Sequence, residues 1–215
     1  MLYFLTFTEF LIMNKTELNS FLLLPLVEIE VRLGTLGKHF DSNIDKKYFL
    51  EIKQNLENAT NVFKTVEKTN TVEYINNNLK LITCPGKETK LIMKENVFTK
   101  TIQMGNSPFD VRLSINQEFS LKSYIPSFQK ESAGTRKKER NSFIDTNYRY
   151  DLTHVIETIN GITKEKYEIE IEILVTKETL SWKSNYINDF IECKIYDLIN
   201  VVEPIERETF KITFF

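Results

Sequence analysis

The feature that most constrains the fold is the alternating segment 167–173 (YEIEIEI), in which every second residue is a glutamate. Successive side chains of a β-strand point to opposite faces, so the segment predicts a strand with Glu168, Glu170 and Glu172 on one face. Like charges that share a face of a sheet repel, and they need water, basic side chains or a bound cation to compensate them. Residues 27–33 (VEIEVRL) repeat the design. Two acidic strands from opposite ends of the chain predict a shared site.

The composition is that of an ordinary soluble protein. Charged residues make up 27% and hydrophobic residues 41% of the 215 residues, a length that fits one domain. The net charge of −2 argues against a generally basic surface that coats nucleic acid. We expect one domain over residues 27–215, preceded by an N-terminal segment, 1–26, that starts at Met1 or Met13. Residues 1–13 are apolar, but they are too short to span a bilayer and follow no basic region, so neither a targeting signal nor a membrane partner is expected.

Cysteine and histidine are too sparse for most metal and nucleophile chemistry. Cys84 and Cys193 lie far apart in the sequence and are expected to be free thiols. His39 and His154 are the only histidines, which leaves little material for a His-rich metal site or a Ser-His-Asp triad. A bound metal would need oxygen ligands, and these favour Mg²⁺ or Mn²⁺ over Zn²⁺.

Most of the chain shows the two-residue period of strands. Two segments are helical in pattern: residues 45–59, and a stretch from Tyr186 to Leu198 that Pro204 bounds. The predicted strands are residues 27–33, 69–75, 79–83, 90–94, 99–103, 110–118, 136–143, 148–153 and 167–173. Turn-forming residues separate several of them, at 76–78, 85–86 and 160–161. Short strands joined by turns indicate an antiparallel sheet, barrel or sandwich.

Acids and bases are segregated among these strands. The acids cluster on the first and last strands, whereas the bases are Arg112 and the alternating set Arg136, Lys138 and Arg140. For any single strand, charges turned to solvent are the simpler explanation, but a solvated face usually mixes both signs. Segregation favours a closed barrel with an acidic and a basic wall facing each other. Such a cavity suits a polyphosphate, because Arg and Lys bind phosphate oxygens and carboxylates hold a divalent cation that bridges to them.

Five segments, in this order, resemble a known family. They are residues 27–34, 109–118, 136–140, 149–153 and 167–173. The set resembles the triphosphate tunnel metalloenzymes, specifically the metal-dependent RNA 5′-triphosphatases of mRNA capping found in fungi, microsporidia, protozoa and large DNA viruses. One Glu-x-Glu strand is weak evidence for this family, whereas five ordered motifs are strong.

The resemblance implies an α+β, mainly β fold: an eight-stranded antiparallel barrel with flanking helices. It also implies hydrolysis of the γ-phosphate of 5′-triphosphate RNA to 5′-diphosphate RNA, the first step of mRNA capping, together with nucleotide hydrolysis with Mn²⁺. The partners that it implies are the 5′ end of nascent mRNA, an mRNA guanylyltransferase and a second copy of the chain. The expected location is the nucleus or, for a virus, the compartment where capping occurs.

The resemblance also assigns roles to residues of this sequence. The metal ligands, for Mg²⁺ or Mn²⁺, would be Glu28, Glu30 and Glu172. The phosphate-binding residues would be Arg112, Lys138, Arg140, Arg136 and an upstream lysine, with Lys94 preferred to Lys100. The catalytic group would add Glu168 and Glu170, one of which positions the attacking water, and the supporting residues Arg149, Asp151 and Thr153.

Two other functions fit parts of the sequence. Small-molecule tunnel enzymes, which act on tripolyphosphate, thiamine triphosphate or free nucleotide, share the Glu-x-Glu-x-Lys/Arg start, but they generally lack an element like residues 149–153. A noncatalytic RNA-binding β-domain would use aromatic side chains on a basic sheet. Tyr148, Tyr150 and Tyr167 lie on the strand face away from the charges, so we predict that they pack in a core.

Overall fold

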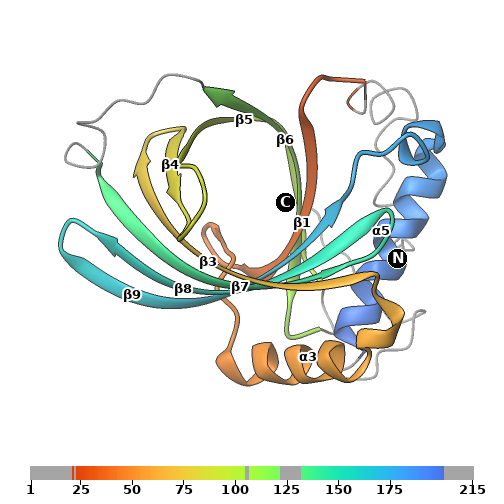
Figure 1. The fold of residues 1–215 in the computed structure, drawn as a ribbon. Coiled ribbons are helices and arrows are strands. Elements are labelled where there is room, and N and C mark those ends of the chain that lie inside the picture. The colour runs from red at the N-terminus through yellow and green to blue at the C-terminus, as the bar shows by residue number, and fades with distance from the viewer. Residues whose placement is uncertain (1–20, 22, 105–106, 122–131, 201–215) are drawn as a thin grey trace.

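The computed structural model describes residues 21, 23–104, 107–121 and 132–200 (Figure 1). The candidate start residues Met1 and Met13 and the expected helix boundary at Pro204 lie outside these residues.

The described chain forms a closed antiparallel barrel of eight strands with one short extra strand, as predicted (Figure 1). The strands are β1 (Val27–Leu36), β2 (Phe40–Asp41), β3 (Thr65–Asn76), β4 (Leu79–Thr83), β5 (Lys90–Ile102), β6 (Asp110–Leu121), β7 (Gly134–Ile144), β8 (Tyr148–Ile159) and β9 (Ile162–Ile173). The helices are α3 (Lys46–Asn58), α5 (Ser184–Ile199) and the short 3-10 turns η1 (Thr60–Val62) and η2 (Thr179–Ser181). The order β1-β6-β5-β4-β3-β7-β8-β9 closes because β9 pairs with β1.

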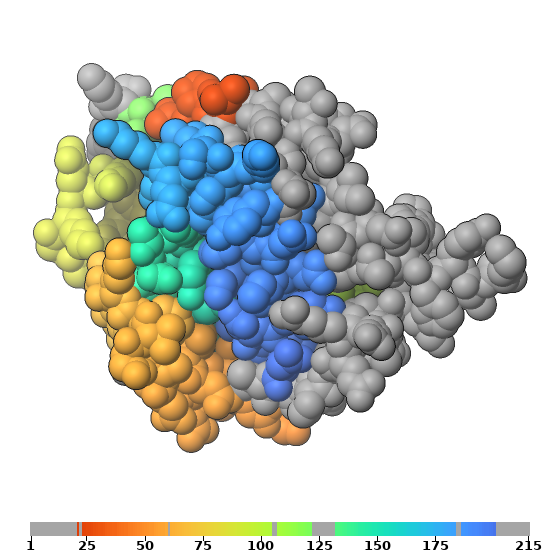
Figure 2. All heavy atoms as spheres, turned by 90° about the vertical axis from the view of Figure 1, so that its right-hand side faces the viewer, coloured from red at the N-terminus to blue at the C-terminus, as the bar shows by residue number. Residues whose placement is uncertain are grey.

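The alternating pattern sorts the side chains between the two faces of the barrel wall. The apolar residues of β1, β6, β8 and β9 point outward and are almost fully buried, as in Ile29, Leu113, Leu152 and Ile171. Helices α3 and α5 lie on this outer side and cover it (Figure 2). The main hydrophobic core is therefore outside the barrel, and the polar faces of the strands are left for its interior.

The two helices agree with their predicted positions. Helix α3 begins after Asp45, whose side chain accepts a hydrogen bond from the Lys47 amide at 2.7 Å and caps the helix. Its buried face carries Phe49, Ile52 and Leu56. Within the described part of the chain, neither helix is both long and apolar enough to cross a membrane.

The strand prediction is wrong in several details, and the strands predicted over 148–153 and 167–173 are longer in the structure, as β8 and β9. The segments predicted as separate strands at 90–94 and 99–103 form one strand, β5, because a bulge between Asn96 and Phe98 absorbs the break in alternation. Gly34 does not end the first strand, which continues to Leu36. A Cβ atom at Gly34 would lie 2.2 Å from the Asp41 carbonyl oxygen, so glycine is what allows the missed strand β2 to lie against β1 there.

The turns follow the predicted chemistry. Asn160 and Gly161 both have positive φ angles, 51° and 76°, as expected for the two-residue hairpin that joins β8 to β9. Asn77, with φ of 53°, starts the equally short turn between β3 and β4. These tight turns fix the register of the hairpins that carry the charged residues.

Candidate active site

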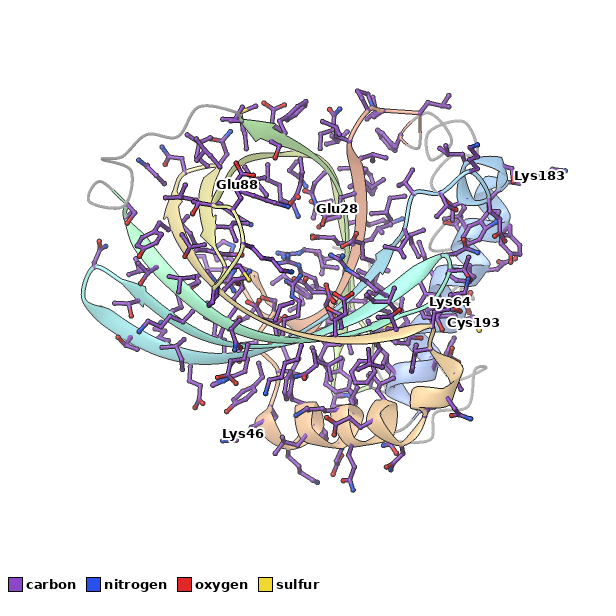
Figure 3. The ribbon with its side chains drawn as sticks, in the orientation of Figure 1. Glu28, Lys46, Lys64, Glu88, Lys183 and Cys193 are labelled. Carbon is purple, nitrogen blue, oxygen red and sulfur yellow. The ribbon has the colours of Figure 1, made fainter. Side chains whose placement is uncertain are left out.

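Barrel closure brings the two acidic strands together. Glu30 of β1 lies directly opposite Glu172 of β9, and Arg32 lies opposite Glu170. Paired residues in a sheet point to the same face, so the side chains of the three predicted metal ligands share one region of the interior. Figure 3 shows Glu28 inside the ring of strands, whereas Lys46 of α3 points away from it.

The acids and bases form ion pairs rather than the two opposed walls that segregation suggested. Arg32 and Arg140 both contact Glu170, at 2.7 and 3.5 Å, and Arg136 contacts Glu168 at 2.6 Å. The opposed-wall prediction is therefore wrong. Its physical flaw is that buried carboxylates need a cation in direct contact, because separation across a cavity compensates too little of the desolvation cost.

Asp151 and Thr153 of β8 hold the neighbouring arginines in place. Asp151, which is 1% exposed, accepts hydrogen bonds or ion pairs from Arg140 and Arg149, both at 3.0 Å, and from Ser142. Thr153 accepts a hydrogen bond from Arg140 Nε at 3.1 Å. These contacts fix the direction of two guanidinium groups in the tunnel.

Lys94, and not Lys100, lies in the interior. Lys94 Nζ contacts Glu28, contacts Glu30 at 2.7 Å and lies 3.4 Å from Glu118. Lys100 is paired with Leu113, a residue of the outer core, so it belongs to the outer face of β5. The choice between the two lysines depends on the β5 bulge, which shifts the alternation between them.

The acidic side chains differ in how completely the bases neutralise them. Burial, reinforced by the Glu30 carboxylate, raises the pKa of Glu28 to about 9. Burial also raises the pKa of Glu172 to about 7, although Arg149 contacts it at 2.5 Å. Burial alone would also raise the pKa of Glu170. The positive charges of Arg32 and Arg140 outweigh this effect and lower the pKa well below its usual range. Glu28 and Glu172 are therefore the acids that most lack positive charge.

The predicted metal ligands fit a hard divalent cation in the chemistry of their donor atoms, which are carboxylate oxygens. Within residues 21, 23–104, 107–121 and 132–200, no three Asp, Glu, His or Cys side chains are grouped as they stand to hold a metal. The reason is visible at each acid: Lys94 contacts Glu28 and Glu30, and Arg149 contacts Glu172. The Lys94 ammonium lies at Glu28 and Glu30, in the place that a metal ion bound by these acids would take. The site therefore accommodates positive charge. Carboxylate oxygens are also the donors that Mg²⁺ and Mn²⁺ prefer.

Two cations in the interior make no ion pair among the described residues. Arg112 of β6 stacks on the Phe40 ring at 4.7 Å, and its Nε is buried without a hydrogen-bond partner. Lys80 of β4 was not predicted as a site residue. Both line a polar cavity of about 260 Å³, together with Glu30 and Lys94. An anion bound in this cavity would supply the missing partners.

Glu73 of β3 is a second site residue that the sequence analysis missed. Strand β3 is separated from β1 by three strands in either direction around the barrel, so Glu73 belongs to the far wall. It is 6% exposed, contacts Lys138 Nζ at 2.7 Å, and its other carboxylate oxygen is buried without a partner. Burial, reinforced by the nearby Arg136 and Arg140 and opposed by Glu73, lowers the pKa of Lys138 to about 8.

The signals for Lys80 and Glu73 are weak in the sequence. Each is a single charged residue in a predicted strand, 79–83 or 69–75, and no alternating charged partner accompanies it. Only the strand register shows that they face the interior.

A larger cavity, of about 540 Å³, lies mainly against the outer faces of β3, β7 and β8 and is lined by residues such as Val72, Pro85 and Ile156. It contains few of the charged groups described above, so the interior cavity is the better candidate site. The predicted aromatic residues Tyr148, Tyr150 and Tyr167 pack in the outer core, as expected. They are not available there as a stacking platform for RNA bases.

Comparisons with known proteins agree with this geometry. The family model described as mRNA capping enzyme, beta chain, matches residues 31–207. The fold is similar to the RNA triphosphatase Pct1 of S. pombe, with a TM-score of 0.71, 16% identity, and coverage of 89% of this chain and 91% of that chain. A structure of Pct1 in complex with the Spt5 CTD gives a TM-score of 0.70 at 18% identity, covering 86% and 90%.

The capping enzyme triphosphatase of Mimivirus has a TM-score of 0.59 and 17% identity, and the alignment covers 86% of this chain and 96% of that chain. At these identities the structural likenesses show the tunnel fold alone. No match is found among curated protein sequences. The family model, however, spans most of the chain and nearly all of the barrel. The chain therefore belongs to the family of the mRNA capping enzyme β chain, the tunnel-fold RNA triphosphatases, which are hydrolases.

Proposed function

We propose that this protein removes the γ-phosphate from the 5′-triphosphate end of RNA in a reaction that depends on Mg²⁺ or Mn²⁺. The products are a 5′-diphosphate RNA end and inorganic phosphate. The observation that carries the proposal is the ionic interior of the closed barrel, where partly neutralised carboxylates lie beside two cations, Arg112 and Lys80, that make no ion pair among the described residues. A triphosphate and a divalent cation together would complete both sets of charges.

The metal would be held by Glu28, Glu30 and Glu172. When bound, it would supply Lewis-acid stabilisation of negative charge on the phosphate oxygens. These three acids lie on two adjacent strands, β1 and β9. Arg112 lies on β6, which is the other neighbour of β1.

The protein's own cations would orient the triphosphate. Arg112 and Lys80 are available in the cavity without breaking an ion pair, and we assign them to direct phosphate contact. Lys138, Arg140 and Arg136 approach from β7 on the other side of the barrel. A charge-stabilising group of this kind acts by being held in the right place before the reaction begins.

The remaining polar residues would keep these cations in position while water attacks the γ-phosphate. Glu170 stays ionised between Arg32 and Arg140, so we assign it to orienting the two guanidinium groups. Glu168 does the same for Arg136, and Arg149, Asp151 and Thr153 form the supporting set on β8. Attack by water in line with the leaving β-phosphate then needs no covalent intermediate on the protein.

Substrate choice is tested by phosphate release from four compounds. We expect 5′-triphosphate RNA to be hydrolysed with Mg²⁺ or Mn²⁺, nucleoside triphosphates to be hydrolysed with Mn²⁺, and a chelator to abolish both activities. Tripolyphosphate and thiamine triphosphate should be poorer substrates than RNA at equal concentration. A clear preference for either small molecule would favour a small-molecule tunnel enzyme, and metal-independent RNA binding without phosphate release would favour a noncatalytic RNA-binding domain.

Partners and location follow from the same reaction class. The diphosphate end is the substrate for guanylyl transfer, so we propose that an mRNA guanylyltransferase acts next and that the protein works in the nucleus or in a viral capping compartment. A homodimer is a further proposal. Size-exclusion chromatography with light scattering, with and without a guanylyltransferase, would measure both associations.

A further inference from the structure

The Lys94 side chain occupies the oxygens that a metal would need. Its ammonium contacts both Glu28 and Glu30, and the side chain is 15% exposed. The second oxygen of Glu30 is also engaged, by Arg32 at 3.3 Å and Asn116 at 3.4 Å. Both oxygens of Glu30 are therefore already in contact with a donor, and a divalent cation at Glu28 and Glu30 would compete most directly with the Lys94 ammonium, which contacts both acids.

Lys94 is the group best able to withdraw. Arg32 is fixed by a second, closer contact to Glu170 at 2.7 Å, and Asn116 lies on the adjacent strand with a further hydrogen bond to Asn96 at 3.0 Å. Lys94, by contrast, is a flexible side chain whose ammonium contacts three carboxylates and makes no other polar contact within the part of the chain that the structure describes. We infer that Lys94 is an exchangeable cation, which neutralises Glu28 and Glu30 without metal and moves to the triphosphate when a divalent cation binds those acids. This inference rests on the proposed function.

The cavity provides a place for the displaced ammonium. Lys94 lines the same 260 Å³ space as Lys80 and Arg112, so a modest rotation of its side chain would leave it among cations that face the expected phosphates. Without an anion, these three cations would repel one another and Arg32, which also lines the space. With a triphosphate present, the displaced Lys94 ammonium would strengthen the binding of the triphosphate.

The exchange predicts coupling between metal and triphosphate. Each ligand favours the same displaced position of Lys94, so each should raise the affinity for the other. Without triphosphate, Lys94 competes with the metal and weakens its binding. The protein would then bind the metal firmly only when a triphosphate is also present.

The test compares full-length wild type with Lys94→Met, which keeps the length of the side chain and removes its charge. Isothermal titration with Mn²⁺ alone should show about tenfold tighter binding for the variant, within the usual range of coupling between sites. With inorganic tripolyphosphate as the probe, the gain in Mn²⁺ affinity on adding tripolyphosphate should fall about tenfold relative to wild type. Without metal, the variant should melt at a lower temperature, because Glu28 and Glu30 lose their shared cation.

Lys80→Met is the matched control. It removes the same charge from the same cavity, but Lys80 makes no salt bridge to Glu28 or Glu30 among the described residues. Any tightening of Mn²⁺ binding in this variant therefore measures the general loss of positive charge. The inference is overturned if Lys94→Met binds Mn²⁺ no more tightly than Lys80→Met, or if its coupling to tripolyphosphate equals that of wild type.

A second variant guards against misfolding. Lys94→Arg retains the charge and should restore the metal-free melting temperature if the ammonium position matters. Failure of the proposed function gives a different pattern: wild type would bind no Mn²⁺ with or without tripolyphosphate and would release no phosphate. A wild type that binds and hydrolyses, beside a Lys94→Met variant with unchanged Mn²⁺ affinity and coupling, would overturn the exchange alone.

Discussion

At the scale of single residues, Glu28 and Glu172 differ from the other tunnel acids in how much positive charge surrounds them. Their pKa values are raised to about 9 and about 7, whereas two arginines lower that of Glu170. A buried carboxylate that is incompletely paired gains most from a divalent cation. These two acids should therefore be more important for metal binding than for holding the barrel together.

Replacement of either acid tests this directly. We expect Glu28→Ala and Glu172→Ala to fold but to lose at least about a hundredfold in kcat, since one charge-stabilising group contributes roughly 3 kcal/mol to the barrier. Glu165→Ala is the control on the same strand as Glu172, because Glu165 lies on the outer face with the Tyr167 hydroxyl. Phosphate release and circular dichroism measure the two effects, and near-normal turnover by either tunnel variant would contradict the metal assignment.

Lys80 offers a separate residue-scale prediction. Lys80→Met should raise KM for 5′-triphosphate RNA by about tenfold, because one hydrogen-bonded charge contributes about 1.5–3 kcal/mol. Lys137→Met is the control, since Lys137 is an exposed lysine on the outer face of β7. An equal change in KM for both variants would show that Lys80 acts only through net charge.

Lys138 predicts a pH dependence. Its pKa falls from 10.5 to about 8 through burial, so between these values the folded protein loses the proton while the unfolded chain keeps it. Stability should therefore rise with pH in this window, as the cost of a buried charge disappears, while kcat/KM should fall above pH 8 as a phosphate-binding cation is lost. Lys138→Arg keeps its charge and should flatten the fall in kcat/KM; an identical profile in both proteins would exclude Lys138 as its cause.

At the scale of elements, alternation predicted the strands well because it reports which face of each strand is buried. The strand at 79–83 and the helix at 45–59 agree closely with β4 and α3. The β5 bulge was missed because one extra residue looks like the end of a strand when the partner strand is unknown. Strand β2 was missed because two residues are too few to show any period.

From the residue pattern alone the site was predictable only where charges repeat along a strand, whereas Lys94 was named from the family resemblance. Alternation predicted the acids of β1 and β9 and the bases of β7, and the structure places all of these in the interior. Lys80 and Glu73 were not predicted, and acids and bases were expected to face each other across a space rather than in contact. Pairing depends on strand order, which a local pattern does not contain.

Gly34 carries a prediction at the element scale. A methyl group at Gly34 would lie 2.2 Å from the Asp41 oxygen and 2.6 Å from the Phe40 ring, so Gly34→Ala should displace β2. Phe40 would then no longer stack on Arg112, and we expect a lower melting temperature together with a higher KM. Gly37→Ala, where a Cβ meets no atom within 4 Å, is the matched control. Unchanged KM in Gly34→Ala would show that β2 does not position Arg112.

At the scale of the whole molecule, the internal ion pairs make the barrel independent of metal for its fold. Addition of a chelator should abolish phosphate release but leave the far-ultraviolet circular dichroism unchanged. Mn²⁺ at a hundred times its Kd should then raise the melting temperature by roughly 5–10 °C, because ligand binding at this excess stabilises the folded state by about 2.7 kcal/mol. Loss of secondary structure on chelation would show that the metal has a structural role.

Among the described residues, β9 is the last strand made during synthesis, and it pairs with the first, β1. Glu172 meets Glu30 only after the ribosome has translated the whole of the intervening sequence, so a nascent fragment that stops before β9 lacks Glu168, Glu170 and Glu172 of the proposed catalytic centre. Premature termination should thus yield inert polypeptides rather than partly active ones. Contacts between such distant segments also slow folding, and activity is expected to emerge late and all at once.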